Sequence, residues 1–296
     1  MDKDSLDNKL HKSWREIIAD VAKKLSGSQA AQEARWMVYE VAGITEESSL
    51  EEMAKLRQVN RLNSLIERRL KGEPLQYVLG NWQFRTLDLM IDSRVLIPRP
   101  ETEVLVGLVL GECERLLSEF PDITGINLAD LGCGSGAIGL SVAAECNKAS
   151  VWCTDISADA ISVTRANLAG LGMAGQKVSI SQGAWFEALP KEMLTSFHLV
   201  VSNPPYIKDE QQLPLEVSEW EPEIALRSGP LGTEYLSYIL KNAPRWLVQG
   251  GSLFLELSPE QSSSLAEEAR NLDYENVRIF PDMAGVNRVL VAGKPI

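Results

Sequence analysis

The chain has 296 residues, 45% hydrophobic and 24% charged, which is enough for a catalytic domain plus a smaller one and excludes a disordered protein. Because no apolar run reaches the roughly 18 residues of a membrane span and residues 1–13 are polar, we expect no membrane segment, no signal peptide and a cytoplasmic location. The net charge is −12, and residues 101–296, with 13 Lys and Arg against 26 Asp and Glu, carry −13, which disfavours nucleic acid as a substrate.

The first part of the chain has the pattern of a small helical bundle. Four stretches carry apolar residues at three- and four-residue spacings, which predicts helices over residues 14–25, 29–42, 49–59 and 61–71. Gly27, Gly43 and Gly72 follow these stretches and favour chain reversal there. We therefore predict an N-terminal helical domain, residues 1–73, and we expect it to dock a protein substrate.

Residues 74–97 change character and form short, strand-like runs. These runs lie at 77–79, 82–84, 87–91 and 95–97, and turn-forming residues separate them. We predict a β-hairpin linker over residues 74–97, followed by a C-terminal domain, residues 98–296. The stretch Pro98 to Glu103 leads into a helix whose first turn carries carboxylates.

Strands and helices alternate from Ile126 onward. The expected strands are residues 126–131, 150–154, 177–181, 198–202, 252–256, 276–280 and 288–292. This α/β alternation predicts a seven-stranded, mostly parallel sheet that is covered by helices on both faces.

A glycine-rich turn follows the first of these strands. It runs Asp130-Leu-Gly-Cys-Gly-Ser-Gly-Ala-Ile-Gly139, and its glycines allow a tight bend with no side chain to block a ligand. Asp155 ends the next strand, where a carboxylate accepts hydrogen bonds from ribose hydroxyls. We predict a nucleoside-binding crevice.

These residues alone do not identify the nucleoside that the crevice binds. Residues 134–139 also satisfy the GxGxxG fingerprint of NAD enzymes, although Asp130 is not part of that fingerprint, and a structural loop without ligand is the other alternative. A serine hydrolase is excluded, since Cys133 stands two residues before Ser135 where GxSxG needs glycine.

The fourth strand ends at Asn203-Pro204-Pro205-Tyr206. Each proline keeps the residue before it out of the α region, so the Asn203 side-chain oxygen and the Pro204 carbonyl oxygen converge on one point. A planar NH2 group has two donors that fit this pair, and Tyr206 offers a ring face. The alternative is an ordinary turn with asparagine as a cap.

Cysteine and histidine are scarce. Four cysteines (Cys113, Cys133, Cys146 and Cys153) form no CxxC pair, and the histidines are His11 and His198. We therefore predict no metal site and no disulfides. A Cys-His nucleophilic pair is the alternative, but His198 lies inside an apolar strand and we interpret it as structural.

These motifs resemble those of a known family. The glycine turn resembles motif I of class I S-adenosylmethionine-dependent methyltransferases, and Asn203 to Tyr206 resembles the motif of those that methylate planar nitrogens. With Pro74-Leu-Gln-Tyr77, Leu96-Ile-Pro-Arg-Pro-Glu-Thr-Glu103 and Glu221-Pro, the chain is similar to the release factor glutamine methyltransferase family, also called HemK or PrmC.

The resemblance implies a Rossmann-like methyltransferase sheet and methylation of N5 of the glutamine in the Gly-Gly-Gln loop of class I release factors. It implies catalytic roles for Asn203, Pro204, Pro205 and Tyr206. It assigns S-adenosylmethionine to Gly132, Cys133, Gly134, Ser135, Gly136, Asp155, Trp185 and Asn203. The family usually has Asp where Ala184 stands, so an adenine contact there is in doubt.

Other functions stay open on the sequence. They are glutamine methylation of a ribosomal protein, adenine-N6 methylation of nucleic acid, an NAD oxidoreductase and a non-enzymatic S-adenosylmethionine-binding module. The charge of residues 101–296 argues against nucleic acid. We expect a release factor as partner, no membrane, and a monomer.

Overall fold

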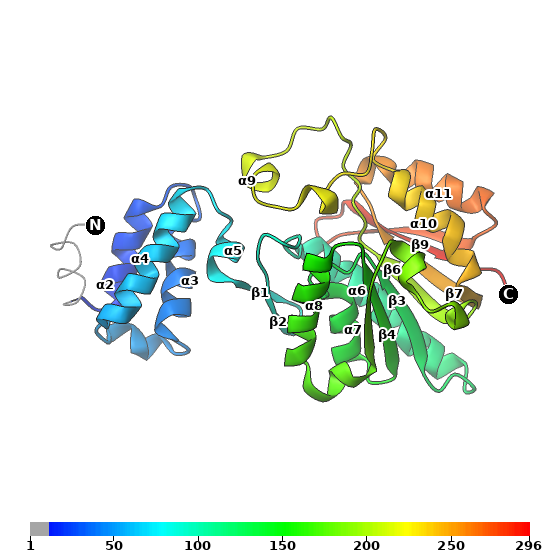
Figure 1. The fold of residues 1–296 in the computed structure, drawn as a ribbon, viewed down its shortest axis with the longest axis horizontal. Coiled ribbons are helices and arrows are strands. Elements are labelled where there is room, and N and C mark those ends of the chain that lie inside the picture. The colour runs from blue at the N-terminus through cyan, green and yellow to red at the C-terminus, as the bar shows by residue number, and fades with distance from the viewer. Residues whose placement is uncertain (1–11) are drawn as a thin grey trace. The chain divides into compact units, whose positions relative to one another are not determined.

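The computed structural model describes residues 12–296, and the chain divides into two compact units, Met1–Gly80 and Asn81–Ile296 (Figure 1). His11 and most of the polar stretch at residues 1–13 lie outside the described residues. Within residues 12–296, no helix is both long and apolar enough to cross a membrane.

The first unit is built of helices. They are α2 (Trp14–Lys24), α3 (Ala30–Ala42), the 3-10 turn η1 (Glu47–Glu51), α4 (Leu56–Leu70) and α5 (Leu75–Leu79). Ser13 caps α2 in a capping box with Glu16, and Gly43, at φ 68°, ends α3 in the left-handed region. Buried apolar residues from all four α-helices form one core, so this unit has a hydrophobic centre of its own.

The predicted helix at residues 61–71 is present as part of α4, which starts earlier, at Leu56, whereas the predicted helix at residues 49–59 is wrong. Val59, Leu62, Leu65 and Ile66 are buried at helical spacing, so the pattern continues across the point where we expected a break. Met53 before it is extended and bridges to Ser13, which leaves only the short turn η1 in that region.

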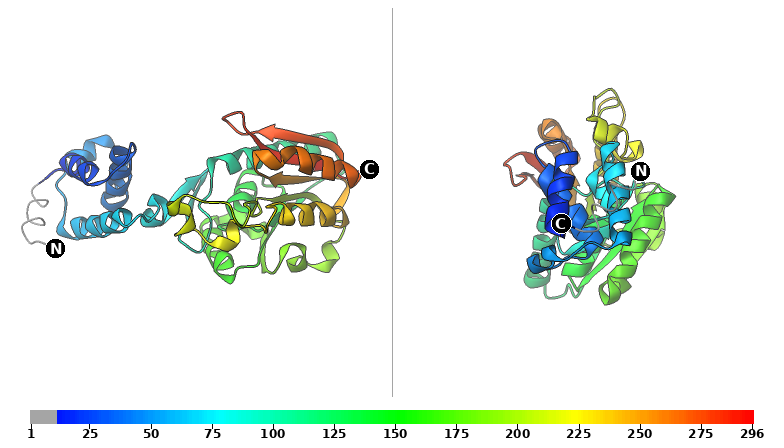
Figure 2. Two further views of the ribbon diagram at one scale, coloured as in Figure 1. Left: turned by 90° about the horizontal axis from the view of Figure 1, so that it is seen from above. Right: turned by 90° about the vertical axis from the view of Figure 1, so that its left-hand side faces the viewer.

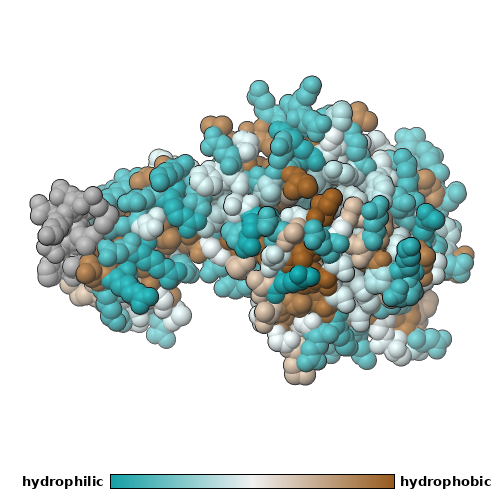
Figure 3. Space-filling model, in the orientation of Figure 1, coloured by the Kyte–Doolittle hydropathy of each residue, from teal (hydrophilic) through white to brown (hydrophobic). Residues whose placement is uncertain are grey.

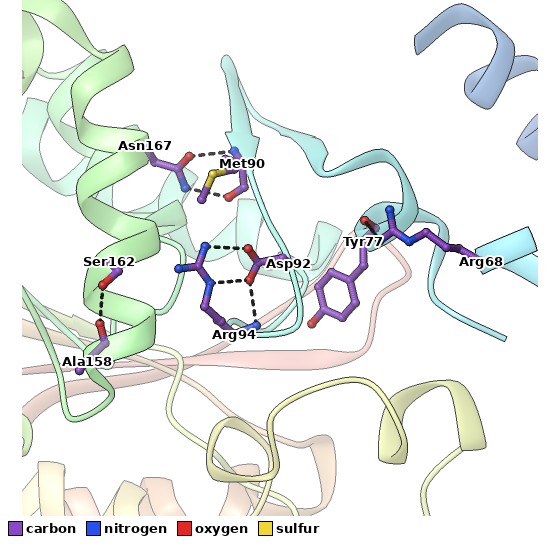
Figure 4. Close-up of polar contacts among 8 residues, drawn as sticks. All are labelled: Arg68, Tyr77, Met90, Asp92, Arg94, Ala158, Ser162 and Asn167. Atoms are coloured by element: carbon purple, nitrogen blue, oxygen red, sulfur yellow. Dashed lines mark hydrogen bonds and ion pairs between the residues drawn. The ribbon is translucent and has the colours of Figure 1, made fainter. Parts of the chain in front are cut away.

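Two predicted strands are also wrong. Residues 77–79 belong to α5, where Leu75 and Val78 pack into the helical core and Arg68 donates hydrogen bonds to the Tyr77 and Val78 carbonyls. Residues 95–97 form no strand. They follow a turn in which Arg94 Nε donates to Asp92 Oδ1 at 2.8 Å and Arg94 Nη2 donates to Asp92 Oδ2 at 2.7 Å (Figure 4).

The hairpin belongs to the second unit. It consists of β1 (Asn81–Phe84) and β2 (Leu87–Met90), paired antiparallel. Asn167 of α8 (Ala158–Gly170) accepts from the Met90 N–H at 2.8 Å and donates to the Met90 carbonyl at 3.0 Å (Figure 4). These two bonds hold β2 on the second unit.

All seven predicted strands of the main sheet are present. They are β3 (Ile126–Leu131), β4 (Ala149–Asp155), β5 (Val178–Gln182), β6 (Phe197–Ser202), β7 (Leu247–Glu256), β8 (Glu275–Pro281) and β9 (Asn287–Gly293). The order is β5-β4-β3-β6-β7-β9-β8, and β9 is the one strand of this sheet that runs opposite to the others, so the pairs β7–β9 and β9–β8 are antiparallel. The α/β sheet prediction is confirmed.

Helices cover both faces of this sheet. The pair α10 (Glu234–Asn242) and α11 (Ser262–Asn271) packs side by side on one face, where leucines of β3, β7 and β9 complete the core (Figures 1 and 2). The other face carries α6 (Pro100–Glu119), α7 (Ala137–Glu145) and α8. The remaining short helices are η2 (Gly172–Lys177), η3 (Trp185–Ala188), η4 (Lys191–Met193), α9 (Leu215–Ser218), η5 (Glu223–Ala225), η6 (Ala243–Arg245) and η7 (Pro259–Gln261).

The strand order places a crevice beside β3. Strand β3 has β4 on one side and β6 on the other, so the chain leaves β3 in one direction and later returns on the opposite side. Open α/β sheets bind ligands at the carboxyl ends of strands at such a switch point. The glycine turn after β3 and the Asn203 turn after β6 both lie there.

Candidate functional site

A cavity of about 280 Å³ opens at the carboxyl ends of β3, β4 and β6. Its lining includes every residue that we predicted to bind the cofactor except Gly136: Gly132, Cys133, Gly134, Ser135, Asp155, Trp185 and Asn203. In the view of Figure 3, apolar side chains gather on this unit between α8 and the loop of α9. The volume is close to the lower end for a small-molecule site.

The glycine turn bends sharply over the end of β4. The N–H groups of Gly132 and Cys133 both donate to the Thr154 carbonyl, at 2.8 and 2.9 Å. Gly134 has φ 56° and a Cβ there would meet nothing within 4 Å, so the loop leaves open space on its cavity side. Gly136, at φ 84°, starts α7, and a Cβ there would lie 2.7 Å from Leu140, which indicates a packing role.

Asp155 joins the end of β4 to the glycine turn. Its Oδ2 accepts from the Gly134 N–H and its Oδ1 from the Ser157 N–H, both at 2.9 Å. Burial raises the pKa of this carboxyl, while the backbone hydrogen bonds oppose that rise. The carboxylate is thus fixed in the wall of the cavity.

Trp185 forms an aromatic wall. Its φ of 48° lies in the left-handed region, which is strained for a bulky residue and is typical of functional sites. The ring packs against Tyr235, with centroids 5.2 Å apart, and comes within 3.2 Å of the point where a Gly132 Cβ would lie. Ala184 lines the cavity beside it.

Asp130 is fully buried beneath the glycine turn. Its Oδ2 accepts from the Gly139 N–H at 2.8 Å, and its Oδ1 has no hydrogen-bond partner among residues 12–296. Burial raises the pKa of this carboxyl to about 7. The group therefore titrates near neutral pH.

We expect the free energy of unfolding to fall as the pH rises from about 4 to about 7, because folded Asp130 holds its proton more tightly than the unfolded chain does. A raised pKa stabilises the fold below the ordinary pKa, and that contribution is lost as the pH rises through the folded pKa. Over this pH range, the Asp130→Asn variant should lose less free energy of unfolding than the wild type, and the difference should be on the order of 4 kcal/mol. Urea denaturation at several pH values measures this, and equal pH slopes for both proteins would contradict it.

A second cavity, of about 180 Å³, lies on the other side of the Asn203 turn. Residues 203–207 line it, together with Leu213, Pro214 and Val217 of the following loop. Leu96, Arg99, Asn203, Pro205 and Ala225 line both cavities. Asn203 therefore borders both spaces.

An ion pair builds the shared wall. Arg99 pairs with the buried Glu221 carboxylate, whose other oxygen accepts from the Ile97 N–H at 3.2 Å. This links residues 97–99 to the loop after β6. The sequence motifs contained Arg99 and Glu221, but their partnership across 122 positions was not foreseen.

Sequence reasoning also missed the support of Asn203. Its Nδ2 donates to Thr102 Oγ1 at 3.2 Å, and the Thr102 hydroxyl donates to Glu256 at 2.7 Å. Tyr206 donates to the other oxygen of Glu256 at 3.3 Å, and burial raises the pKa of the Tyr206 hydroxyl. Glu256 could have been found by the argument that found Asp155, because it too is a carboxylate at the carboxyl end of a buried strand.

His198 lies at the start of β6, at the opposite end from Asn203. Its Nδ1 accepts from the Asn127 N–H at 3.0 Å, and burial lowers its pKa, as the structural interpretation predicts. All four cysteines are free. In the part of the chain from residue 12 onward, no group of three or more His, Cys, Asp and Glu side chains could hold a metal ion.

Two family models match the chain: the PrmC N-terminal domain over residues 16–80 and the methyltransferase small domain over residues 112–219. A solved methyltransferase structure from Pyrococcus furiosus is similar to 80% of this chain and 99% of its own, with a TM-score of 0.51 and 18% identity, a likeness that supports the fold.

Relatives of known name match most of the chain. The release factor glutamine methyltransferase of Neisseria gonorrhoeae is 36% identical over 264 residues, 87% of this chain and 91% of its own. That of Rhodopirellula baltica is 34% identical over 82% of this chain and 81% of its own. The bifunctional methyltransferase of Rickettsia typhi is 34% identical over 81% of this chain, which spans about half, 48%, of its length. The chain belongs to the release factor glutamine methyltransferase family, as its motifs predicted.

Proposed function

We propose that this protein transfers a methyl group to N5 of the glutamine in the Gly-Gly-Gln loop of class I peptide-chain release factors. The observation that carries the proposal is that Asn203 lines both of two neighbouring cavities. The larger one suits a nucleoside cofactor and the smaller one suits a single planar side chain. Methyl transfer requires these two ligands to meet at one point.

The residues of the larger cavity fit S-adenosylmethionine, the cofactor of this family. A Cβ at Gly134 would meet nothing within 4 Å and Asp155 is fixed by the Gly134 N–H, which supports the proposal that the ligand lies against this backbone and that Asp155 accepts from its ribose hydroxyls. We propose that Trp185 lies against the adenine and that Asn203 contacts both ligands. When bound, S-adenosylmethionine supplies an electrophilic methyl group.

The Asn203 turn can hold and activate an amide nitrogen. An amide is a poor nucleophile, because its lone pair is delocalised into the carbonyl. If Asn203 Oδ1 and the Pro204 carbonyl each accept one N–H, they fix the rotation of the amide, stabilise positive charge on nitrogen and direct its lone pair into the larger cavity. Pro205 keeps the turn rigid and Tyr206 flanks the planar group. The product proton then leaves to water.

A protein substrate fits the surroundings of the site. Leu215 is 73% exposed and Ile224 54% exposed, on the loop that borders both cavities, and exposed apolar side chains of this kind are typical of protein contacts. The 13 basic against 26 acidic residues over 101–296 oppose a phosphate backbone. We further propose that the enzyme works as a monomer, since residues of one chain line both cavities, and that it is cytoplasmic, as its proposed release factor substrate would be.

Transfer of label from methyl-labelled S-adenosylmethionine to a purified release factor tests the proposal. A release factor with Gly-Gly-Ala in place of Gly-Gly-Gln is the matched control. We expect label on the first protein alone. Label on neither protein, with the cofactor still bound, would contradict the proposed substrate but not the proposed cofactor.

The helical unit is proposed to dock the release factor. The smaller cavity, at about 180 Å³, holds one side chain, so recognition of a folded protein needs further contact surface. A chain that begins at Asn81 should show at least a roughly ten-fold higher KM for the release factor, equivalent to about 1.4 kcal/mol of lost binding. Its turnover on a short Gly-Gly-Gln peptide should stay near that of the full chain. Steady-state kinetics with both substrates measures this, and an unchanged KM for the release factor would refute docking.

A further inference from the structure

A chain of hydrogen bonds leads from the Asn203 carboxamide to a buried carboxylate. Asn203 Nδ2 donates to Thr102 Oγ1 at 3.2 Å, the Thr102 hydroxyl donates to Glu256 Oε2 at 2.7 Å, and Tyr206 donates to Glu256 Oε1 at 3.3 Å. Thr102 is 4% exposed and Glu256 is 1% exposed. The chain therefore connects α6, the end of β7 and the turn after β6 away from water.

The number of protons available to this series of hydrogen bonds decides which group donates and which accepts at each step. An ionised carboxylate only accepts hydrogen bonds, and a hydroxyl has one proton to give. Because the Thr102 hydroxyl donates its one proton to Glu256, Thr102 can offer Asn203 only a lone pair. The NH2 group of Asn203 must therefore face Thr102, and Oδ1 must face the other way.

We propose that Glu256 is a positioning residue, which fixes the Asn203 carboxamide through the Thr102 hydroxyl so that Oδ1 faces the junction of the two cavities. The proposal rests on the proposed function, in which Oδ1 accepts an N–H of the substrate amide. If Glu256 is neutral, Thr102 is free to donate to Asn203 instead. A flipped carboxamide then presents its own NH2 to the NH2 of the substrate, and two donors repel.

The surroundings of Glu256 place this switch in an accessible pH range. Burial raises the pKa of Glu256 to about 7, against the opposing effects of the Thr102 hydroxyl, Arg288 of β9 and the Tyr206 hydroxyl. Glu101 on α6 adds to the rise. Turnover should therefore fall as the pH decreases through about 7.

Four variants test the proposal. Glu256→Gln and Thr102→Val should each lower kcat about ten-fold, the value of one hydrogen bond, with little change in KM for S-adenosylmethionine. Thr102→Ser keeps the hydroxyl and should recover most of that loss. Glu268→Gln is the matched control, because it changes a hydroxyl-carboxylate pair with Ser237 that lies outside both cavities, and it should leave kcat unchanged.

Two further readouts separate positioning from folding. The acid limb of the pH profile should be absent from Glu256→Gln, whereas equal melting temperatures would show that the fold is kept. The ¹⁵N signals of the Asn203 carboxamide, assigned by their loss in Asn203→Ala, should shift with pH in the wild type and stay constant in Glu256→Gln. This NMR result needs no turnover, so it stands even if the proposed substrate is wrong. Wild-type kcat and pH profile in Glu256→Gln, or a Thr102→Ser variant as slow as Thr102→Val, would overturn the proposal.

Discussion

The Asn203→Ala variant should lose about 10²- to 10³-fold in kcat, the usual cost of removing one preorganised contact to developing charge. Asn203 lines both cavities, and its carboxamide donates to Thr102 of α6. The carboxamide is therefore fixed before the substrate arrives. Alanine removes the oxygen that would accept from the substrate amide and leaves the β6 strand intact. Single-turnover kinetics with a release factor measures the loss.

The controls for this variant separate chemistry from binding and folding. Asn242→Ala removes a carboxamide that donates to the Tyr238 carbonyl at the end of α10, outside both cavities, and should keep normal turnover. The melting temperature of Asn203→Ala should stay close to that of the wild type. Near-normal turnover in Asn203→Ala would remove the basis of the mechanism.

The Asp155→Ala variant should bind S-adenosylmethionine about 100-fold more weakly, because it loses hydrogen bonds to a charged group worth about 1.5–3 kcal/mol each. Asp155 also holds the Gly134 N–H, so its loss loosens the glycine turn that forms the cavity wall. Isothermal titration calorimetry measures the affinity directly.

Asp159→Ala is the matched control for Asp155→Ala. Asp159 is an exposed carboxylate in the first turn of α8, four residues along the chain, and it does not line the larger cavity. Its removal should leave the affinity unchanged. An Asp155→Ala variant that binds as tightly as Asp159→Ala would show that the cofactor does not depend on this carboxylate.

Local patterns were sufficient to predict the sheet and both turns of the site. Buried strands of a parallel sheet are short apolar runs, and glycine or proline at their ends marks where the chain turns. The glycine turn, Asp155 and Asn203 each follow such a run directly. Parallel strands present their carboxyl ends at one edge, so these residues come together and line one cavity.

The contacts that complete the site join distant parts of the chain. Thr102 and Glu256 are 154 positions apart, and Arg99 and Glu221 are 122 apart, so no local pattern pairs them. The error at residues 77–79 in the helical unit also comes from contacts that a local pattern does not show. Residues 77–79 are rich in strand-forming side chains, but burial of Leu75 and Val78 in the helical core outweighs that local preference.

The central claim is that the amide nitrogen of one glutamine receives the methyl group at the Asn203 turn. Tandem mass spectrometry of the release factor after a single turnover tests it most directly, because fragment ions locate the added methyl group on one side chain. We expect one methyl group on the glutamine of the Gly-Gly-Gln peptide with the wild-type enzyme, and at most about one hundredth as much in the same time with Asn203→Ala. A methyl group on another residue, or on the glutamine with Asn203→Ala at the wild-type rate, would contradict this account.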